Sequence, residues 1–62
     1  MKNNNIRDFR VSHFYTQKQL SKVVGVSQQA VNKWEHGQQP SMLNCLRLAA
    51  LFGVRVEDLF LT

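Results

Sequence analysis

Four polar side chains recur at a spacing that would place them on one face of a helix: Gln28, Gln29, Asn32 and Lys33. A Gln or Asn amide presents a donor beside an acceptor, which matches N6 and N7 of adenine in the major groove of DNA, and a lysine can reach guanine or a phosphate. None of the four is acidic, although a solvated helix face usually mixes Glu with Lys. Taken alone, this face fits base recognition and an ordinary solvated surface about equally well.

The elements that would position this face are two short helices and a tight turn, over about residues 17–35. Thr16, with Gln19 three residues later, has the pattern of a capping box, so the first of these helices should begin just after Thr16. Gly25 can adopt the left-handed backbone that ends a helix, and Ser27 is a favourable N-cap for the next one. This is the spacing of a helix-turn-helix unit. Apolar residues occur before the turn at Leu20, Val23 and Val24 and after it at Val26, Val31 and Trp34, and the buried positions expected on the second helix are Ala30, Val31 and Trp34.

The rest of the chain also has helical periodicity, and no stretch alternates as a strand would. We expect a first helix over about residues 4–13, a fourth over about 42–52 and a short fifth over about 56–60, after a loose polar tail at residues 1–5. The core face of the fourth helix is predicted to carry Met42, Cys45, Leu46, Ala49 and Phe52, with Leu43 and Ala50 off that face.

Length and composition predict one small domain, spanning residues 1–62, with a basic balance. Eight Lys and Arg stand against four Asp and Glu, for a formal charge of +4, which suits a polyanionic partner. Cys45 is the only cysteine, so neither a disulfide framework nor a cysteine zinc site is expected. His13 and His36 lie on separate elements without a carboxylate cluster, which argues against an enzyme, a metal site or a cofactor. Because the apolar runs are too short for a membrane span and no signal peptide precedes the domain, we expect a cytoplasmic protein without a membrane partner.

Motifs spread over almost the whole chain resemble those of the lambda-type repressor and Cro family, also called the Xre family. The residues that carry the resemblance are Ile6-Arg7 with Arg10, Thr16-Gln17 with Leu20, Gly25-Val26-Ser27, Trp34-Glu35-His36-Gly37, Pro40-Ser41, Phe52-Gly53-Val54 and Val56-Glu57-Asp58-Leu59-Phe60. The resemblance implies a compact all-α domain of five helices that binds operator DNA, usually as a two-fold dimer. The helix after Ser27 would then enter the major groove.

The resemblance also implies roles for single residues. Base edges would be contacted by Gln28, Gln29, Asn32 and Lys33. Phosphate contacts are expected from Thr16, Gln17, Lys18, His36 and Gln38. Gln17 would in addition brace Gln28, and Arg10 and Glu35 match a family pair that forms a partly buried salt bridge between the first and third helices. Phe14 departs from the pattern, because the family mostly has Gly there to end the first helix, and a bulky residue is poorly suited to left-handed backbone.

Together these features predict a regulator that binds double-stranded DNA sequence-specifically, a repressor of Cro or CI type at a palindromic operator, without a small-molecule ligand. Two alternatives stay open: a DNA-binding antitoxin that uses the same face and also holds a toxin, and a protein-interaction domain that has lost DNA binding. A homodimer contact is expected near the C-terminal end, because Phe60 and Leu61, as neighbours about 100° apart on a helix, cannot both point inward. The residues expected in that interface are Val56, Phe60 and Leu61.

Overall fold

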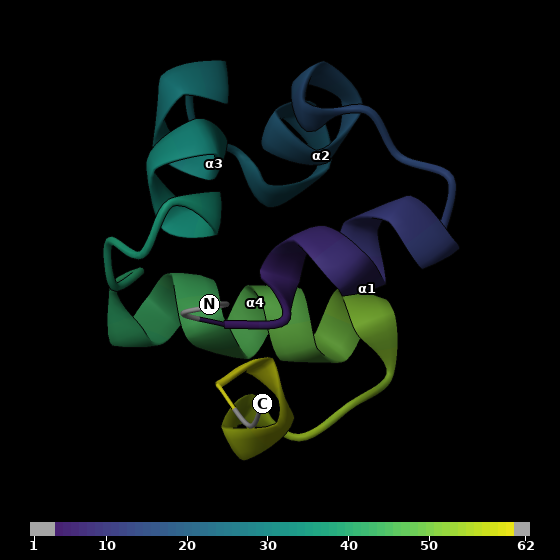
Figure 1. The fold of residues 1–62 in the computed structure, drawn as a ribbon, viewed down its shortest axis with the longest axis vertical. Helices are drawn as coiled ribbons and strands as arrows, with labels where there is room; N and C mark the ends of the chain where they lie inside the picture. Colours follow the sequence, from purple (N-terminus) through teal and green to yellow (C-terminus); the bar gives the residue numbers. More distant parts are fainter. Residues whose placement is uncertain (1–3, 61–62) are drawn as a thin grey trace.

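The computed structural model describes residues 4–60, which fold into four α-helices and one turn of 3₁₀-helix (Figure 1). The elements are α1 (Ile6–Ser12), α2 (Gln17–Val24), α3 (Gln28–Glu35), α4 (Met42–Phe52) and η1 (Val56–Leu59). This part of the chain contains no strand. It also contains no helix with the length and apolar character that crossing a lipid bilayer requires.

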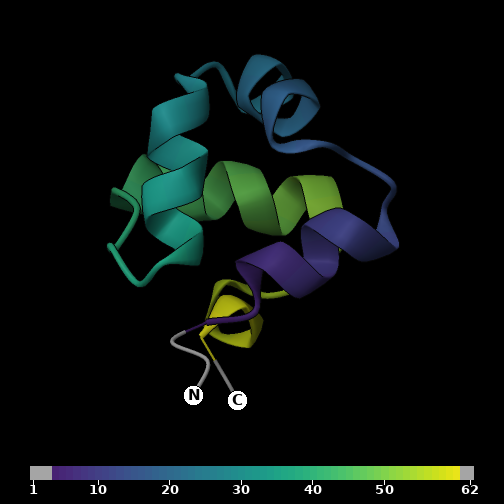
Figure 2. The same ribbon diagram turned by 45° about the horizontal axis from the view of Figure 1, so that its top comes forward.

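The helix-turn-helix formed by α2 and α3 lies on one side of the molecule, above α1, α4 and η1 (Figure 1). In Figure 2, α3 stands upright while α2 is seen nearly end-on, so the two helices cross steeply. The Thr16 hydroxyl accepts the Gln19 N–H at 3.0 Å and the Gln19 amide oxygen accepts the Thr16 N–H at 2.9 Å, which completes the expected capping box. Gly25 ends α2 with φ 88°, and the Ser27 hydroxyl caps α3 by accepting the Ala30 N–H at 3.1 Å.

Each element contributes at least one fully or nearly fully buried apolar side chain to a single core. Phe9 of α1 also packs against it, with its ring stacked on that of Phe52 of α4 at a centroid separation of 5.6 Å. Because all elements share this core, packing against α1 and α4 fixes how α2 and α3 lie relative to each other. The buried apolar residues are Ile6, Leu20, Val24, Val31, Trp34, Cys45, Leu48, Ala49, Phe52 and Leu59.

The first described residues are held in place, and the expectation of a loose tail is wrong for two of them. Asn4 is buried; its Nδ2 donates to the Trp34 carbonyl at 2.7 Å and its Oδ1 accepts the Ile6 N–H at 3.0 Å. Asn5 donates its backbone N–H to the Leu59 carbonyl at 2.7 Å. These bonds tie the start of α1 to α3 and η1, and α1 is therefore shorter than the range expected from sequence. Residues 1–3 of the predicted tail lie outside the described residues.

The end of α1 keeps the geometry that usually calls for glycine. The Tyr15 N–H donates to the Arg10 carbonyl at 3.1 Å and the Phe14 N–H to the Val11 carbonyl at 3.0 Å, the bonding pattern of a Schellman motif. Phe14 occupies the left-handed position with φ 62°, and its side chain is 91% exposed. The turn therefore keeps the geometry of a glycine-ended helix although a bulky residue stands at this position, and the phenyl ring projects into solvent.

The boundaries expected for α4 agree with the structure, and its predicted core face is confirmed at Cys45, Ala49 and Phe52 but wrong at two positions. Met42 and Leu46 are 69% and 52% exposed, whereas Leu48, which the prediction left out, is fully buried. The buried residues follow Cys45 at intervals of three, four and seven, the spacing of one helix face. Since nearly every side chain of α4 is apolar, hydrophobic periodicity could not fix which face turns inward.

The fifth helix is a single 3₁₀ turn, so the five-helix count is corrected to four α-helices and η1. The Arg55 N–H donates to Asp58 Oδ2 at 2.9 Å and the Asp58 N–H returns to the Arg55 carbonyl at 3.0 Å, which closes a turn too tight for an α-helix. Val56 and Phe60, expected at a dimer interface, are half-buried and pack against the core. Leu61 lies outside the described residues.

Candidate nucleic-acid interface

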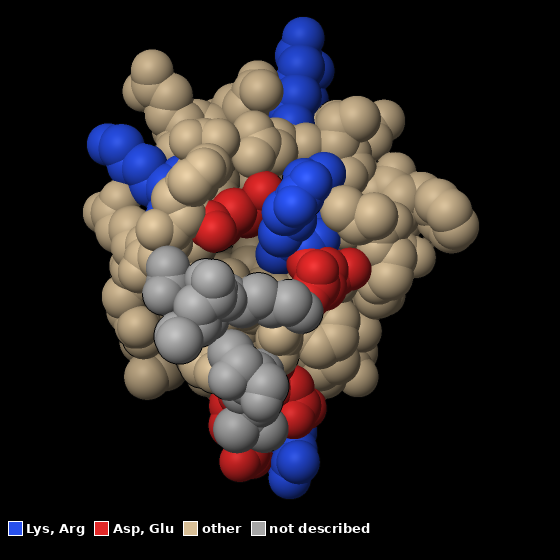
Figure 3. Space-filling view, in the orientation of Figure 1, with Lys and Arg blue, Asp and Glu red and all other residues tan. Residues whose placement is uncertain are grey.

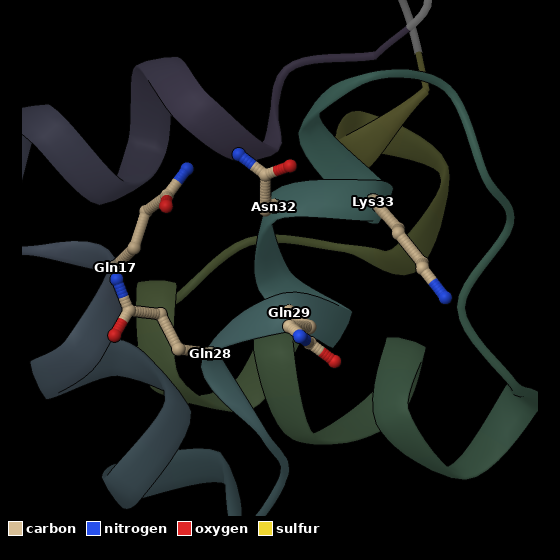
Figure 4. Close-up of a pocket in the computed structure, with 5 residues that line it drawn as sticks. All are labelled: Gln17, Gln28, Gln29, Asn32 and Lys33. Atoms are coloured by element: carbon tan, nitrogen blue, oxygen red, sulfur yellow. The ribbon is translucent and has the colours of Figure 1, made fainter.

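The outward face of α3 carries the four polar side chains that the sequence pattern brings together, and all four are exposed. With Gln17 of α2 they line an open cavity of about 550 Å³ whose lining includes no carboxylate. Figure 4 shows Gln28 directed toward Gln17, whereas Lys33 projects on the side of α3 that faces away from α2. Two elements therefore present amide groups to the same surface. The four residues of α3 are Gln28, Gln29, Asn32 and Lys33.

This face points outward because the opposite face of α3 is anchored. Val31 is fully buried and Trp34 is 5% exposed, both in the core that α3 shares with the other helices. Burial of these two side chains leaves the residues about half a turn away toward solvent. The face of α3 is therefore set by core packing and does not depend on a bound ligand.

A hydrogen-bonded carboxylate lies behind this face and joins α1, α2 and α3. Arg10 Nε donates to Glu35 Oε2 at 2.6 Å and Arg10 Nη2 to Oε1 at 3.3 Å, in an ion pair whose side chains are only 12% and 3% exposed. Arg10 Nη1 donates to the Tyr15 carbonyl at 2.8 Å. Gln17 Nε2 also donates to Glu35 Oε1, at 3.0 Å, a contact that the sequence did not indicate. The Gln17 amide is thus oriented before any ligand arrives.

Two of the five residues expected to bind phosphate share a cavity. Gln17 and His36 line a second cavity, of about 390 Å³, while Thr16, Lys18 and Gln38 line neither of these two cavities. Thr16 lies at the start of α2, where its hydroxyl oxygen is already used in the capping box. Lys18 and Gln38 are exposed, on α2 and on the loop after α3.

The second cavity contains a residue that the sequence analysis did not select. Its lining consists of Arg7, Arg10, Gln17, Glu35 and His36. Arg7 is exposed, one turn before Arg10 on α1. The spacing of these two arginines at i and i+3, beside an expected ion pair, is the signal that could have identified it. Because Gln17 lines both cavities, the second one continues the surface of the first.

Charge is distributed unevenly over the molecule. Figure 3 shows Lys and Arg side chains projecting over α2 and α3, while Asp and Glu side chains gather at the opposite end and beside cations at the centre of the view. At that opposite end, η1 carries Glu57 and Asp58, which approach Arg55 at 3.4 Å and 3.6 Å. The end of the molecule that presents α2 and α3 is therefore the one suited to a polyanion.

Metal-ligating clusters and the cysteine were the remaining candidates for chemistry in the described part of the chain. Residues 4–60 contain no group of three or more His, Cys, Asp and Glu side chains that could hold a metal ion. Cys45 is buried in the core, and burial raises the pKa of its thiol, which disfavours the reactive thiolate.

Comparisons with known proteins agree with this geometry. A family model described as "Helix-turn-helix" matches residues 6–59. Uncharacterised HTH-type transcriptional regulators of Methanocaldococcus jannaschii and Archaeoglobus fulgidus are 37% and 39% identical, over 94% and 90% of this chain and 89% and 81% of those proteins. The crystal structure of a hypothetical transcription factor from Neisseria, NHTF, matches 87% of this chain with a TM-score of 0.76 and 27% identity, and the match covers 62% of that chain. The chain therefore belongs to the helix-turn-helix family of the lambda-repressor (Xre) type, a family of DNA-binding transcriptional regulators rather than of enzymes.

Proposed function

We propose that the chain is a sequence-specific regulator that represses transcription from a palindromic operator, in the manner of Cro-type repressors. The observation that supports this most directly is the exposed amide face of α3, whose cavity lining contains no carboxylate. In the proposed complex α3 lies in the major groove. The residues in contact with base edges are Gln28, Gln29, Asn32 and Lys33.

Gln17 would connect base recognition to the rest of the fold. Its Nε2 donates to Glu35, and the Gln28 side chain is directed toward Gln17 (Figure 4). In the proposed complex the Gln17 amide oxygen would accept a hydrogen bond from the Gln28 amide. A Gln28 side chain held in this way loses less rotamer freedom on binding than a free one. The expected consequence is a preference for adenine opposite Gln28, because its amide can then pair with N6 and N7 at once.

Backbone contacts would come from the ends of the two helices. Thr16, Gln17 and Lys18 lie at the start of α2, and His36 and Gln38 follow the end of α3. These five residues would bind phosphates on either side of the groove that α3 enters. Phosphate contacts fix the register of a protein on DNA and make its affinity depend on salt, without selecting a sequence.

The test is a binding-site selection from random duplex, followed by affinity measurements on the selected and a random sequence. Gln28→Ala and Gln29→Ala should each weaken binding to the selected site by about 1–3 kcal/mol and change binding to random DNA little. Lys33→Ala should weaken both and lower the dependence on salt. Arg55→Ala, which removes a cation just before η1 and far from α3, is the matched charge control and should behave as wild type.

Two results would contradict the proposal. Equal losses on both sequences for the Gln28 and Gln29 variants would mean that these residues position the protein and do not read bases. If the wild-type protein showed no salt-dependent binding to any duplex, the alternative of a protein-interaction domain without DNA binding would be favoured.

A further inference from the structure

The cavity beside the Arg10–Glu35 ion pair has the charge of an anion site. The Glu35 carboxylate accepts hydrogen bonds from both Arg10 and Gln17 and is almost fully buried, so little of its charge is open to a ligand. Arg10 is held by Glu35 and Tyr15, whereas Arg7 is exposed at the same cavity. Two guanidinium groups and one carboxylate give the lining a net charge of one positive unit while His36 is neutral.

His36 is the variable member of this lining, and its neutral tautomer is fixed by the structure. Its Nδ1 lies 2.8 Å from the carbonyl oxygen of Asn32. A carbonyl oxygen can only accept, so Nδ1 carries the hydrogen and Nε2 is left as the free ring nitrogen. In the neutral ring Nε2 is an acceptor and opposes a phosphate oxygen. In the protonated ring Nε2 becomes a donor and the net charge of the lining doubles.

We propose that this cavity receives a backbone phosphate of bound DNA and that protonation of His36 converts it from a poor to a good phosphate site, so that DNA affinity rises as pH falls. The inference rests on the proposed function, because the cavity shares Gln17 with the base-reading face. Arg7 supplies the permanent charge and His36 the pH-dependent donor. The titratable and charged groups that face His36 are Arg7 and Arg10 from α1 and Glu35 from α3, and Gln17 of α2 completes the lining.

The chain contains a matched control for His36. His13 also follows the end of a helix, and its Nδ1 also lies near the carbonyl oxygen four residues earlier, at 2.9 Å from that of Phe9. It packs on the Phe52 ring at a centroid distance of 5.2 Å and does not line the cavity. The two histidines therefore share local geometry and differ in whether a phosphate could reach them.

The experiment measures the affinity of the intact chain for the selected duplex at about pH 6 and about pH 8, at fixed low salt. For each bound copy, wild type should bind about tenfold more tightly at the lower pH, the effect of one charge-assisted hydrogen bond gained per copy. His36→Gln should bind equally at both pH values, near the wild-type level at the higher one. His36→Arg should bind tightly at both, and His13→Gln should keep the wild-type pH dependence.

Further measurements distinguish a failure of this inference from a failure of the proposed function. The slope of affinity against salt should be steeper by about one phosphate per bound copy at the lower pH for wild type and unchanged for His36→Gln. Arg7→Gln should weaken binding at both pH values. If His36→Gln kept the full pH dependence, the inference would be overturned while DNA binding stood. If the protein bound no duplex at either pH, both would be overturned.

Discussion

The Glu35 carboxylate is a single residue on which three helices depend, because it belongs to α3 and accepts hydrogen bonds from Arg10 of α1 and Gln17 of α2. We predict that Glu35→Ala lowers the free energy of unfolding by about 3 kcal/mol or more, since it leaves a mostly buried guanidinium without a partner. The double variant Arg10→Met, Glu35→Leu should lose less, because it removes both charges. Thermal melts of wild type and of the two variants measure these losses of stability. A Glu35→Ala melt identical to wild type would show that the pair contributes no stability.

Phe14 is the one non-glycine residue with positive φ in the described part of the chain, and it holds that conformation without burying its ring. Phe14→Gly should raise the free energy of unfolding by about 1 kcal/mol, the left-handed penalty less the entropy that glycine adds to the unfolded chain. Phe14→Ala is the control, because it removes the ring and keeps the Cβ, and it should differ from wild type by less than about 0.5 kcal/mol. Equal melts for the Gly and Ala variants would show that the backbone there is not strained.

The residues of the base-reading face could be predicted from sequence, whereas those of the second cavity could not. Gln28, Gln29, Asn32 and Lys33 belong to one helix, so a period of 3.6 residues is enough to place them on one side. Arg7 and His36 come from different helices, and their proximity depends on how α1 packs against α3. No local pattern encodes that packing, and the hydrogen bond from Gln17 to Glu35 escaped prediction for the same reason.

At the scale of elements, α3 is too short to be a stable helix on its own. Its first turn depends on the Ser27 cap, and its position in the molecule depends on the burial of its apolar side chains in the core. Ser27→Ala should cost about 1 kcal/mol of stability by removing the acceptor of the Ala30 N–H, and it should also weaken DNA binding because the recognition helix frays at its first turn. Ser41→Ala removes an equivalent cap from α4, where the hydroxyl accepts the Asn44 N–H. It should cost similar stability and leave DNA affinity unchanged. Equal DNA affinities for the two variants at matched stability would contradict a role for the start of α3.

Element boundaries were most predictable where side chains cap the helix. The capping box at Thr16 and the caps at Ser27 and Ser41 mark the starts of α2, α3 and α4, and glycines mark the ends of α2 and α4. Prediction of the start of α1 failed because a distant contact decides it: Asn4 bonds to the Trp34 carbonyl, 30 residues away. The shape of η1 depends on local bonds instead, between the Arg55 N–H and Asp58 Oδ2 and between the Asp58 N–H and the Arg55 carbonyl.

At the scale of the whole molecule, size limits what one copy can read. The described residues measure 25 × 23 × 22 Å. Equivalent positions in successive turns of the major groove lie roughly 34 Å apart, so one chain presents α3 to one half-site only. A palindromic operator is therefore expected to need two copies. The proposed contact between them involves Val56 and Phe60, both half-buried near the C-terminal end of the described residues, together with Leu61.

The final prediction concerns this assembly. Sedimentation over a range of concentrations should show a weak dimer for wild type, because little apolar surface remains on Val56 and Phe60 once they pack against the core. Leu61→Glu should shift the protein toward monomer and flatten its binding curve on a palindromic duplex, while binding to a single half-site stays as in wild type. Leu46→Glu is the matched control, since Leu46 is 52% exposed on the outer face of α4. If Leu46→Glu disrupts the dimer and Leu61→Glu does not, the interface lies on α4, because a carboxylate destabilises a contact only where it becomes buried.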